Sequence, residues 1–142
     1  MTPHSYVLLT TILLLFPLGY LFLACPAFLL VRLSVPKVPV LLRAMFRGYF
    51  WMLLVISPFA VLAYTVAGKT WPAVGVCLIG VFAFVEYRWF MRNFEAALEA
   101  RDTGDADTSA LAVRRLRRLH VTGMLVNVVV LSSVILGIPY VV

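Results

Sequence analysis

The sequence predicts an all-α integral membrane protein, built as a four-helix bundle whose successive helices run up and down. Of its 142 residues 63% are hydrophobic, only 13% are charged, and the mean hydropathy is +1.02. Soluble domains have about 45–50% apolar and about 25% charged residues. The charged residues also leave four long apolar segments, and a helix needs about 20 such residues to cross about 30 Å of hydrocarbon. We therefore expect a single transmembrane domain over residues 1–142.

Four segments are candidates for membrane-spanning helices. We expect spans at about residues 6–31, 45–67, 71–91 and 120–138. The first segment should be retained rather than cleaved as an export signal, because no Lys or Arg precedes it and its apolar run continues beyond Pro26. Pro17 and Pro26 each remove a helical hydrogen bond, so this segment should be bent.

The basic residues predict which way the bundle faces. Of the twelve Lys and Arg, all but Lys69 lie in or beside the first and third loops. Because positive charge concentrates in cytoplasmic loops, we expect these loops inside and both termini outside. The predicted location is the cytoplasmic (inner) membrane of a bacterium, with the termini in the periplasm. Tyr64 and Trp71 are expected in the aromatic belt at the outer boundary.

The third and fourth helices should extend beyond the membrane into the cytoplasm. No helix breaker separates Trp71-Pro72 from Gly104, and side chains at 107–109 are candidate caps for the fourth helix. The two helices should form an antiparallel hairpin in which Glu95 is level with Arg114. Surface ion pairs of this kind contribute about 0–1 kcal/mol each.

A run of four arginines leads directly into the fourth span. Leucines lie between these arginines, and the run sits at the edge of a span, which favours anionic lipid over nucleic acid as the partner. We expect no nucleic acid partner. Lipid head-group contacts are expected from Arg43, Arg47, Arg114, Arg115 and Arg117.

One face of the fourth helix carries the polar side chains nearest the membrane interior. Residues spaced by three and four share a helix face. This face comprises Leu116, His120, Gly123, Asn127, Val130 and Val134. A buried amide needs a hydrogen-bond partner and a glycine permits close helix approach, so we expect this face to point into the bundle.

A polar cluster is expected at the cytoplasmic mouth of the bundle. Its candidate members are Glu86, Arg88, Arg118, His120 and Asn127. Two interpretations stay open. The cluster ties the third helix to the fourth, or it binds the polar head of a lipid-like ligand such as a quinone or an aromatic substrate.

The sequence predicts no cofactor and no metal. His4 and His120 lie about a bilayer apart in the expected topology and so cannot ligate one haem together. No Cys, His and carboxylate spacing is typical of zinc or copper. Cys25 and Cys77 are expected in opposite leaflets and should not form a disulfide. A haem held by one His, a haem shared between subunits and a bound quinone stay open.

Short motifs spread over nearly the whole chain resemble those of one family. They are Pro26-Ala27-Phe28, Phe46–Phe50, Trp89, Asn93, Gly104-Asp105, Arg117-Arg118-Leu119-His120 and Asn127. The set resembles the widespread bacterial four-helix membrane proteins of unknown function that are related to the eukaryotic transmembrane protein linked with cisplatin resistance. The Arg-Leu-His start of the last helix is also, more distantly, similar to anthrone-oxygenase-like membrane proteins. The first resemblance implies a four-helix fold in the membrane and implies no activity.

Three functions stay open, and whether the protein is an enzyme stays open with them. The first is a non-catalytic accessory or assembly subunit that packs against other membrane subunits or a second copy. The second is an oxidoreductase or oxygenase acting on a quinone or aromatic substrate at the mouth formed by Glu86, His120 and Asn127. The third is a carrier of small apolar molecules. Ion transport is not expected, because no charged residue falls at mid-membrane.

Overall fold

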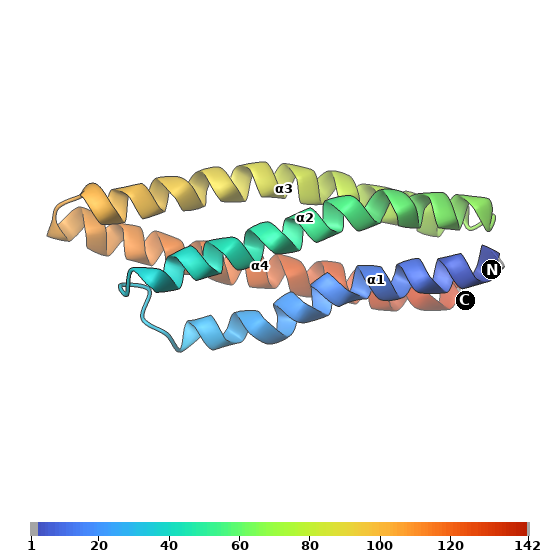
Figure 1. The fold of residues 1–142 in the computed structure, drawn as a ribbon, viewed down its shortest axis with the longest axis horizontal. Coiled ribbons are helices and arrows are strands. Elements are labelled where there is room, and N and C mark those ends of the chain that lie inside the picture. The colour runs from blue at the N-terminus through green and yellow to red at the C-terminus, as the bar shows by residue number, and fades with distance from the viewer. Residues whose placement is uncertain (1–2, 142) are drawn as a thin grey trace.

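The protein is a bundle of four long helices in a computed structural model that describes residues 3–141 (Figure 1). Helix α1 spans Pro3–Ala24 and continues as a short 3-10 helix, η1, over Cys25–Leu29. The others are α2 (Lys37–Val66), α3 (Thr70–Thr103) and α4 (Ala106–Val141). Within residues 3–141 there is no strand. Residues 1, 2 and 142, which the predicted topology places outside, lie beyond the described residues.

Each helix packs against its neighbours in the chain, and α4 closes the bundle by packing against α1. Figure 1 shows the start of α1, the end of α4 and the α2–α3 loop together at one end of the bundle. We call this the terminal end, around residues 3, 67–69 and 141. The loops at 30–36 and 104–105 lie at the opposite end, which we call the basic end, and the α3–α4 hairpin projects furthest there.

All four long helices can cross a membrane by their length and apolar composition. The candidate spans are His4–Leu29, Lys37–Val66, Thr70–Thr103 and Ala106–Tyr140. This confirms the predicted number and order of membrane helices. It also confirms that the third and fourth helices continue beyond their apolar segments. The side of the membrane to which they project stays a prediction.

The first span changes its helix type near its second proline. The α-helix was expected to run to about residue 31, but α1 ends at Ala24 and η1 follows with Pro26 in its first turn. Proline has no N–H to donate and its ring obstructs the preceding turn, so the α-helical hydrogen bonds do not continue through it. Pro17 lies inside α1 without ending the helix.

The α3–α4 turn consists of Gly104 and Asp105. Asp105, rather than a residue at 107–109, caps α4, because its Oδ1 accepts a hydrogen bond of 2.9 Å from the backbone N–H of Thr108. This is the usual bond from a capping side chain to the third helical residue. A side chain at position 104 would place its Cβ 2.5 Å from the carbonyl oxygen of Ala100, so the turn requires glycine there.

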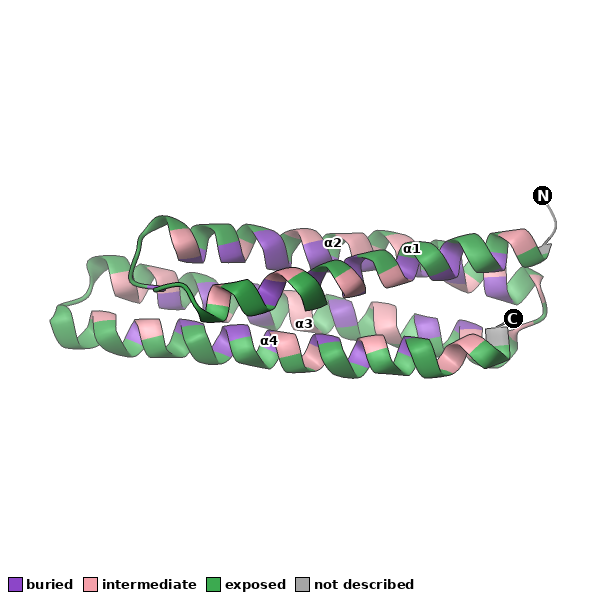
Figure 2. Ribbon diagram, turned by 90° about the horizontal axis from the view of Figure 1, so that it is seen from below, coloured by how far each residue is buried: buried purple, intermediate pink, exposed green. Residues whose placement is uncertain are grey.

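The inner faces of the helices form one core, seen as buried stripes in Figure 2. All six residues of the predicted α4 face are buried, which confirms that this face points into the bundle. Large apolar side chains cover the outside; among them are Phe16, Leu62, Val81 and Leu136. An apolar exterior of this kind is suited to contact with lipid tails.

Candidate functional site

The imidazole of His120 is 1% exposed and has two sulfur atoms close to one of its nitrogens. Its Nε2 is 3.6 Å from Sγ of Cys25 and 3.1 Å from Sδ of Met124. Its Nδ1 has no hydrogen-bond partner among the described residues. The rings of Phe28 and Phe46 lie 6.3 and 6.2 Å from the imidazole, centroid to centroid. The predicted inward-facing histidine is thus buried against sulfur and aromatic groups.

Gly123 makes space for the aromatic side chains beside this histidine. A Cβ at this position would lie 2.6 Å from Cε1 of Phe46 and 3.2 Å from Cε2 of Phe90. The two rings pack against each other with centroids 4.5 Å apart. The close approach predicted at Gly123 is confirmed, and the approaching groups are the rings of α2 and α3.

Asn127 links α4 to α1 in the core. Its Nδ2 donates a hydrogen bond of 3.0 Å to the carbonyl oxygen of Leu18, and its side chain is 1% exposed. Its Oδ1 has no partner among the described residues. The expected hydrogen bond inside the bundle is therefore present, with a backbone carbonyl one residue beyond Pro17 as its acceptor.

The other three members of the predicted cluster form no hydrogen bond, ion pair or ring contact with His120 or Asn127 among the described residues. Glu86 is half-buried, and within residues 3–141 it has neither a hydrogen bond nor an ion pair. The guanidinium of Arg88 lies 5.9 Å from the ring centre of Phe84, and Arg118 is exposed. Helix α3 turns Ala83 and Phe90 inward instead of Glu86. No polar contact among the described residues therefore links Glu86 to His120 or Asn127, and the predicted mouth stays a prediction.

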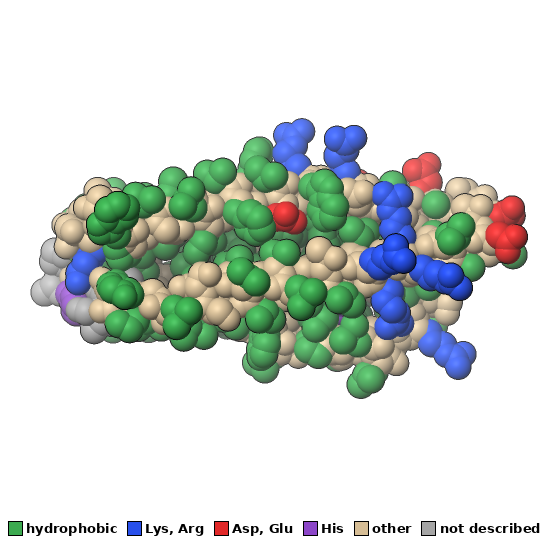
Figure 3. Space-filling view, turned by 180° about the vertical axis from the view of Figure 1, so that it is seen from behind, with side chains coloured by type: hydrophobic (Ala, Val, Ile, Leu, Met, Phe, Trp, Pro, Cys, Tyr) green, Lys and Arg blue, Asp and Glu red, His purple; other side chains and the backbone are tan. Residues whose placement is uncertain are grey.

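The arginines expected at lipid head groups gather toward the basic end, where Figure 3 shows most of the blue side chains on the face it draws. Arg43 of α2 pairs with Glu95, so the expected pairing of Glu95 with Arg114 is wrong. Arg115 instead donates a hydrogen bond of 2.7 Å to Oδ1 of Asn93 across the hairpin. Arg47 and Arg114 are exposed.

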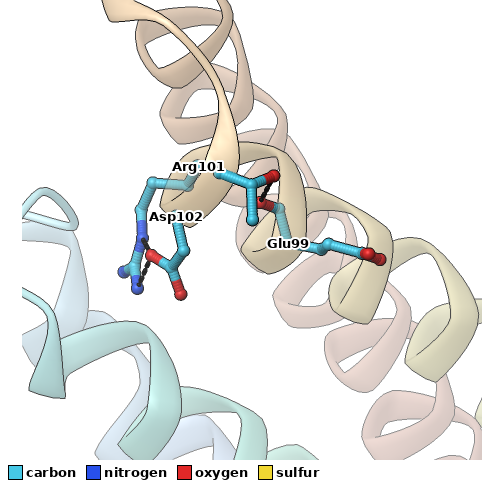
Figure 4. A network of polar contacts seen from close by, with 4 residues as sticks. Glu99, Arg101 and Asp102 are labelled. Carbon is cyan, nitrogen blue, oxygen red and sulfur yellow. Dashed lines mark hydrogen bonds and ion pairs between the residues drawn. The ribbon is translucent and has the colours of Figure 1, made fainter.

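Arg117 holds the end of η1 against α4. Its guanidinium donates hydrogen bonds of 3.0 and 3.4 Å to the carbonyl oxygens of Leu29 and Val31. At the far end of α3, Arg101 pairs with the adjacent Asp102, and the hydroxyl of Thr103 bonds to the carbonyl of Glu99 (Figure 4). These contacts leave fewer arginines free for lipid than the sequence suggested.

A cavity of about 800 Å³ lies in the terminal half of the bundle. Its walls are mostly apolar and come from all four helices, including Leu14 of α1, Val76 and Ile79 of α3, and Val134 of α4. Tyr64 of α2, which was expected in the outer aromatic belt, is 2% exposed and lines this cavity instead. This space is not predicted from the sequence, because its walls come from four separate segments.

Small residues line part of the cavity. Gly75 and Gly137 line it, and a Cβ at either position would meet nothing within 4 Å. Ser133 lines it one helical turn before Gly137. A glycine and a serine one turn apart are a recognisable signal of a thin helix face, although the sequence alone does not say whether a neighbouring helix fills the space.

Compared with models of protein families, with curated proteins and with solved structures, the chain matches none of them. The fold and the four apolar helices define its class, a multi-pass helical membrane protein. The resemblance drawn from the sequence motifs stays a prediction.

Proposed function

We propose that the protein binds and carries a small apolar molecule in the cavity at its terminal half. The volume of the cavity, about 800 Å³, carries this proposal. Ligand sites typically enclose about 300–1,000 Å³ with apolar walls and a few polar groups. A hydrophobic ligand concentrates in the bilayer and can reach such a site from the lipid, so no aqueous channel is needed.

The polar groups of the cavity suggest what the ligand carries. The hydroxyl of Thr11 donates to the carbonyl of Val7 at 2.8 Å, so the Tyr64 hydroxyl is the donor in the 2.7 Å bond between the two hydroxyls. The oxygen of Tyr64 then has spare lone pairs and no spare hydrogen. It can accept a hydrogen bond from an apolar alcohol or phenol, and it cannot donate to an ether.

The test is photolabelling of the protein in lipid nanodiscs with an apolar aryl diazirine. We expect saturable labelling of cavity residues such as Ile79, with n-decanol competing more strongly than methyl nonyl ether. Gly137→Leu and Gly75→Leu should each reduce saturable labelling by about tenfold or more, because a leucine side chain occupies the space. Tyr64→Phe should retain labelling but lose the preference for the alcohol.

Gly48→Leu is the matched control, since a Cβ there also meets nothing within 4 Å and Gly48 does not line the cavity. The filling variants replace glycine in a helix and should fold at least as stably as the wild type. Loss of labelling with retained stability would therefore reflect a filled cavity. Labelling that is not saturable, or equal in the wild type and both filling variants, would refute the proposal.

A second candidate is an accessory subunit that offers α4 to a partner. In the most apolar 18-residue window of α4 only 11% is buried inside the chain, against 39% for the first span. A photo-crosslinking amino acid at Leu125, which is 62% exposed, should capture a protein of defined mass or a second copy in native membranes. The same group at Leu23, exposed on α1, is the control. Capture of lipid alone at Leu125 would speak against this role.

We also propose that the basic end faces the cytoplasm and that Arg47 and Arg114 contact anionic head groups. Single cysteines at Lys69 and Asp102, in a chain whose two native cysteines are alanine, test the orientation. A membrane-impermeant maleimide should label position 69 in intact cells and position 102 only after permeabilisation. The reverse labelling pattern would show that the basic end faces the outside of the cell.

A further inference from the structure

We propose that Cys25, His120 and Met124 form a site for a single copper(I) ion in the basic half of the bundle. Cys25 is 0% and His120 1% exposed, and they come from segments 95 residues apart in the chain. The site does not depend on the apolar cavity. Along α1, Leu14 of the cavity and Cys25 are eleven residues apart, about 16 Å at the usual helical rise.

The two sulfur donors both lie close to the third donor, the imidazole nitrogen Nε2. A metal bonded to nitrogen at about 2.0 Å and to sulfur at about 2.3 Å, with about 120° between the bonds, separates the two donor atoms by about 3.7 Å. The Nε2–Sγ distance is 3.6 Å and the Nε2–Sδ distance is 3.1 Å. The thioether of Met124 is flexible and can move away from Nε2 to reach the longer distance.

The types of donor favour copper(I) over zinc. Thiolate and thioether are soft ligands that select copper(I), whereas a thioether is an unusual ligand for zinc. Counting only His, Cys, Asp and Glu, the described residues contain no group of three that could hold a metal. The third donor here is the sulfur of Met124. A search of the sequence for Cys, His and carboxylate spacing therefore passes over this site.

The charge balance also selects a monovalent ion. As the copper–sulfur bond forms, the Cys25 thiol releases its proton to solution, so the thiolate and copper(I) together carry no net charge. Zinc(II) on the same ligands would leave one uncompensated positive charge among the rings of Phe28 and Phe46, which is costly in an apolar environment. The carboxylate of Glu86, which could have compensated it, has no contact with His120.

Neighbouring groups position the ligands. The two hydrogen bonds from Arg117 to the carbonyls of Leu29 and Val31 hold the segment after η1 against α4. This keeps Cys25, the first residue of η1, beside His120. The Nδ1 of this buried imidazole forms no hydrogen bond of good geometry among the described residues.

The test is transfer of copper(I) from its bicinchoninate complex to the full-length protein in nanodiscs without oxygen. We expect one copper(I) per chain, with one nitrogen and two sulfur ligands in X-ray absorption spectra. Cys25→Ser should weaken binding by about 100-fold and Met124→Leu by about tenfold. Cys77→Ser, at the other and exposed cysteine, and Met91→Leu, at another buried methionine, should bind like the wild type.

Leucine conserves the volume of methionine, so Met124→Leu keeps the test valid if Cys25→Ser does not fold. Equal uptake by Cys25→Ser and Cys77→Ser, equal uptake by Met124→Leu and Met91→Leu, or spectra with nitrogen and oxygen ligands alone would overturn the proposal. Tighter binding of zinc(II) than of copper(I) would overturn the assignment of the ion.

Discussion

The two halves of this bundle use glycine for opposite purposes. In the basic half, Gly123 is in contact with the rings of Phe46 and Phe90, and a methyl group there would overlap with Phe46. In the terminal half, Gly75 and Gly137 border an open space of about 800 Å³. The first glycine permits tight packing, and the other two leave a volume that no side chain of the protein fills.

This contrast indicates where close packing stabilises the bundle. In a membrane the lipid is as apolar as the helices, so helix association depends on close packing and interhelical hydrogen bonds rather than on removal of apolar surface from water. The ring cluster packs closely in the basic half, the Asn127 bond to Leu18 joins α4 to α1 near the middle of the bundle, and the Thr11–Tyr64 bond joins α1 to α2 in the terminal half. The terminal half has this hydrogen bond but leaves the space beside Gly75 and Gly137 unfilled.

The largest expected effect is the difference in stability between a variant with alanine at Gly123 and one with alanine at Gly137. Gly123→Ala should lower the free energy of unfolding by about 1–3 kcal/mol, because the new Cβ would lie 2.6 Å from Cε1 of Phe46. Gly137→Ala should raise it by about 0.5–1 kcal/mol, because alanine favours the helix and the methyl group meets nothing within 4 Å. Unfolding of both variants by SDS in mixed micelles measures the difference. Equal shifts in the two variants would show that the halves do not differ in packing.

A smaller effect is expected at the polar link between α4 and α1. Asn127→Leu should lower the free energy of unfolding by about 1 kcal/mol, since it removes the hydrogen bond to the Leu18 carbonyl from an apolar core. Asn93→Leu is the control, because Asn93 bonds to Trp89 and Arg115 near the surface of the hairpin. The same SDS titration measures both. An unchanged transition for Asn127→Leu would mean that the hydrogen bond to Leu18 does not stabilise the bundle.

The sequence could predict the structural features that depend on a single helix. The spacing of Leu116, His120, Asn127 and Val134 identifies the inner face of α4, because residues three and four apart share a face whatever the neighbouring helices do. The number of spans follows in the same way from apolar length. The extension of α3 and α4 follows from the absence of helix breakers before Gly104.

What depends on the rotation of one helix against another could not be predicted. An ideal antiparallel hairpin would place Glu95 level with Arg114. In the structure Glu95 pairs with Arg43 of α2 instead. The same applies to Cys25, whose position beside His120 depends on how η1 turns after Pro26. The cavity is a third case, since its walls come from four helices whose separation is set by all of their contacts.

The smallest expected effect is at the tip of the basic end and depends on pH. Hydrogen bonds from the Thr108 side chain and backbone N–H lower the pKa of the Asp105 carboxyl, which is fully exposed. A carboxyl whose pKa is lowered on folding stabilises the fold at neutral pH, and this stabilisation is lost as the pH falls below about 4. The protection factor of the Thr108 amide against hydrogen exchange should therefore decrease in acid, while amides in the ring cluster stay protected. Asp105→Asn should keep the cap and remove the pH dependence, whereas Asp107→Asn should leave it in place. Equal protection of the Thr108 amide in acid and at neutral pH would mean that the negative charge of Asp105 does not stabilise the first turn of α4. The uncharged carboxyl group of Asp105 would then be sufficient for the cap.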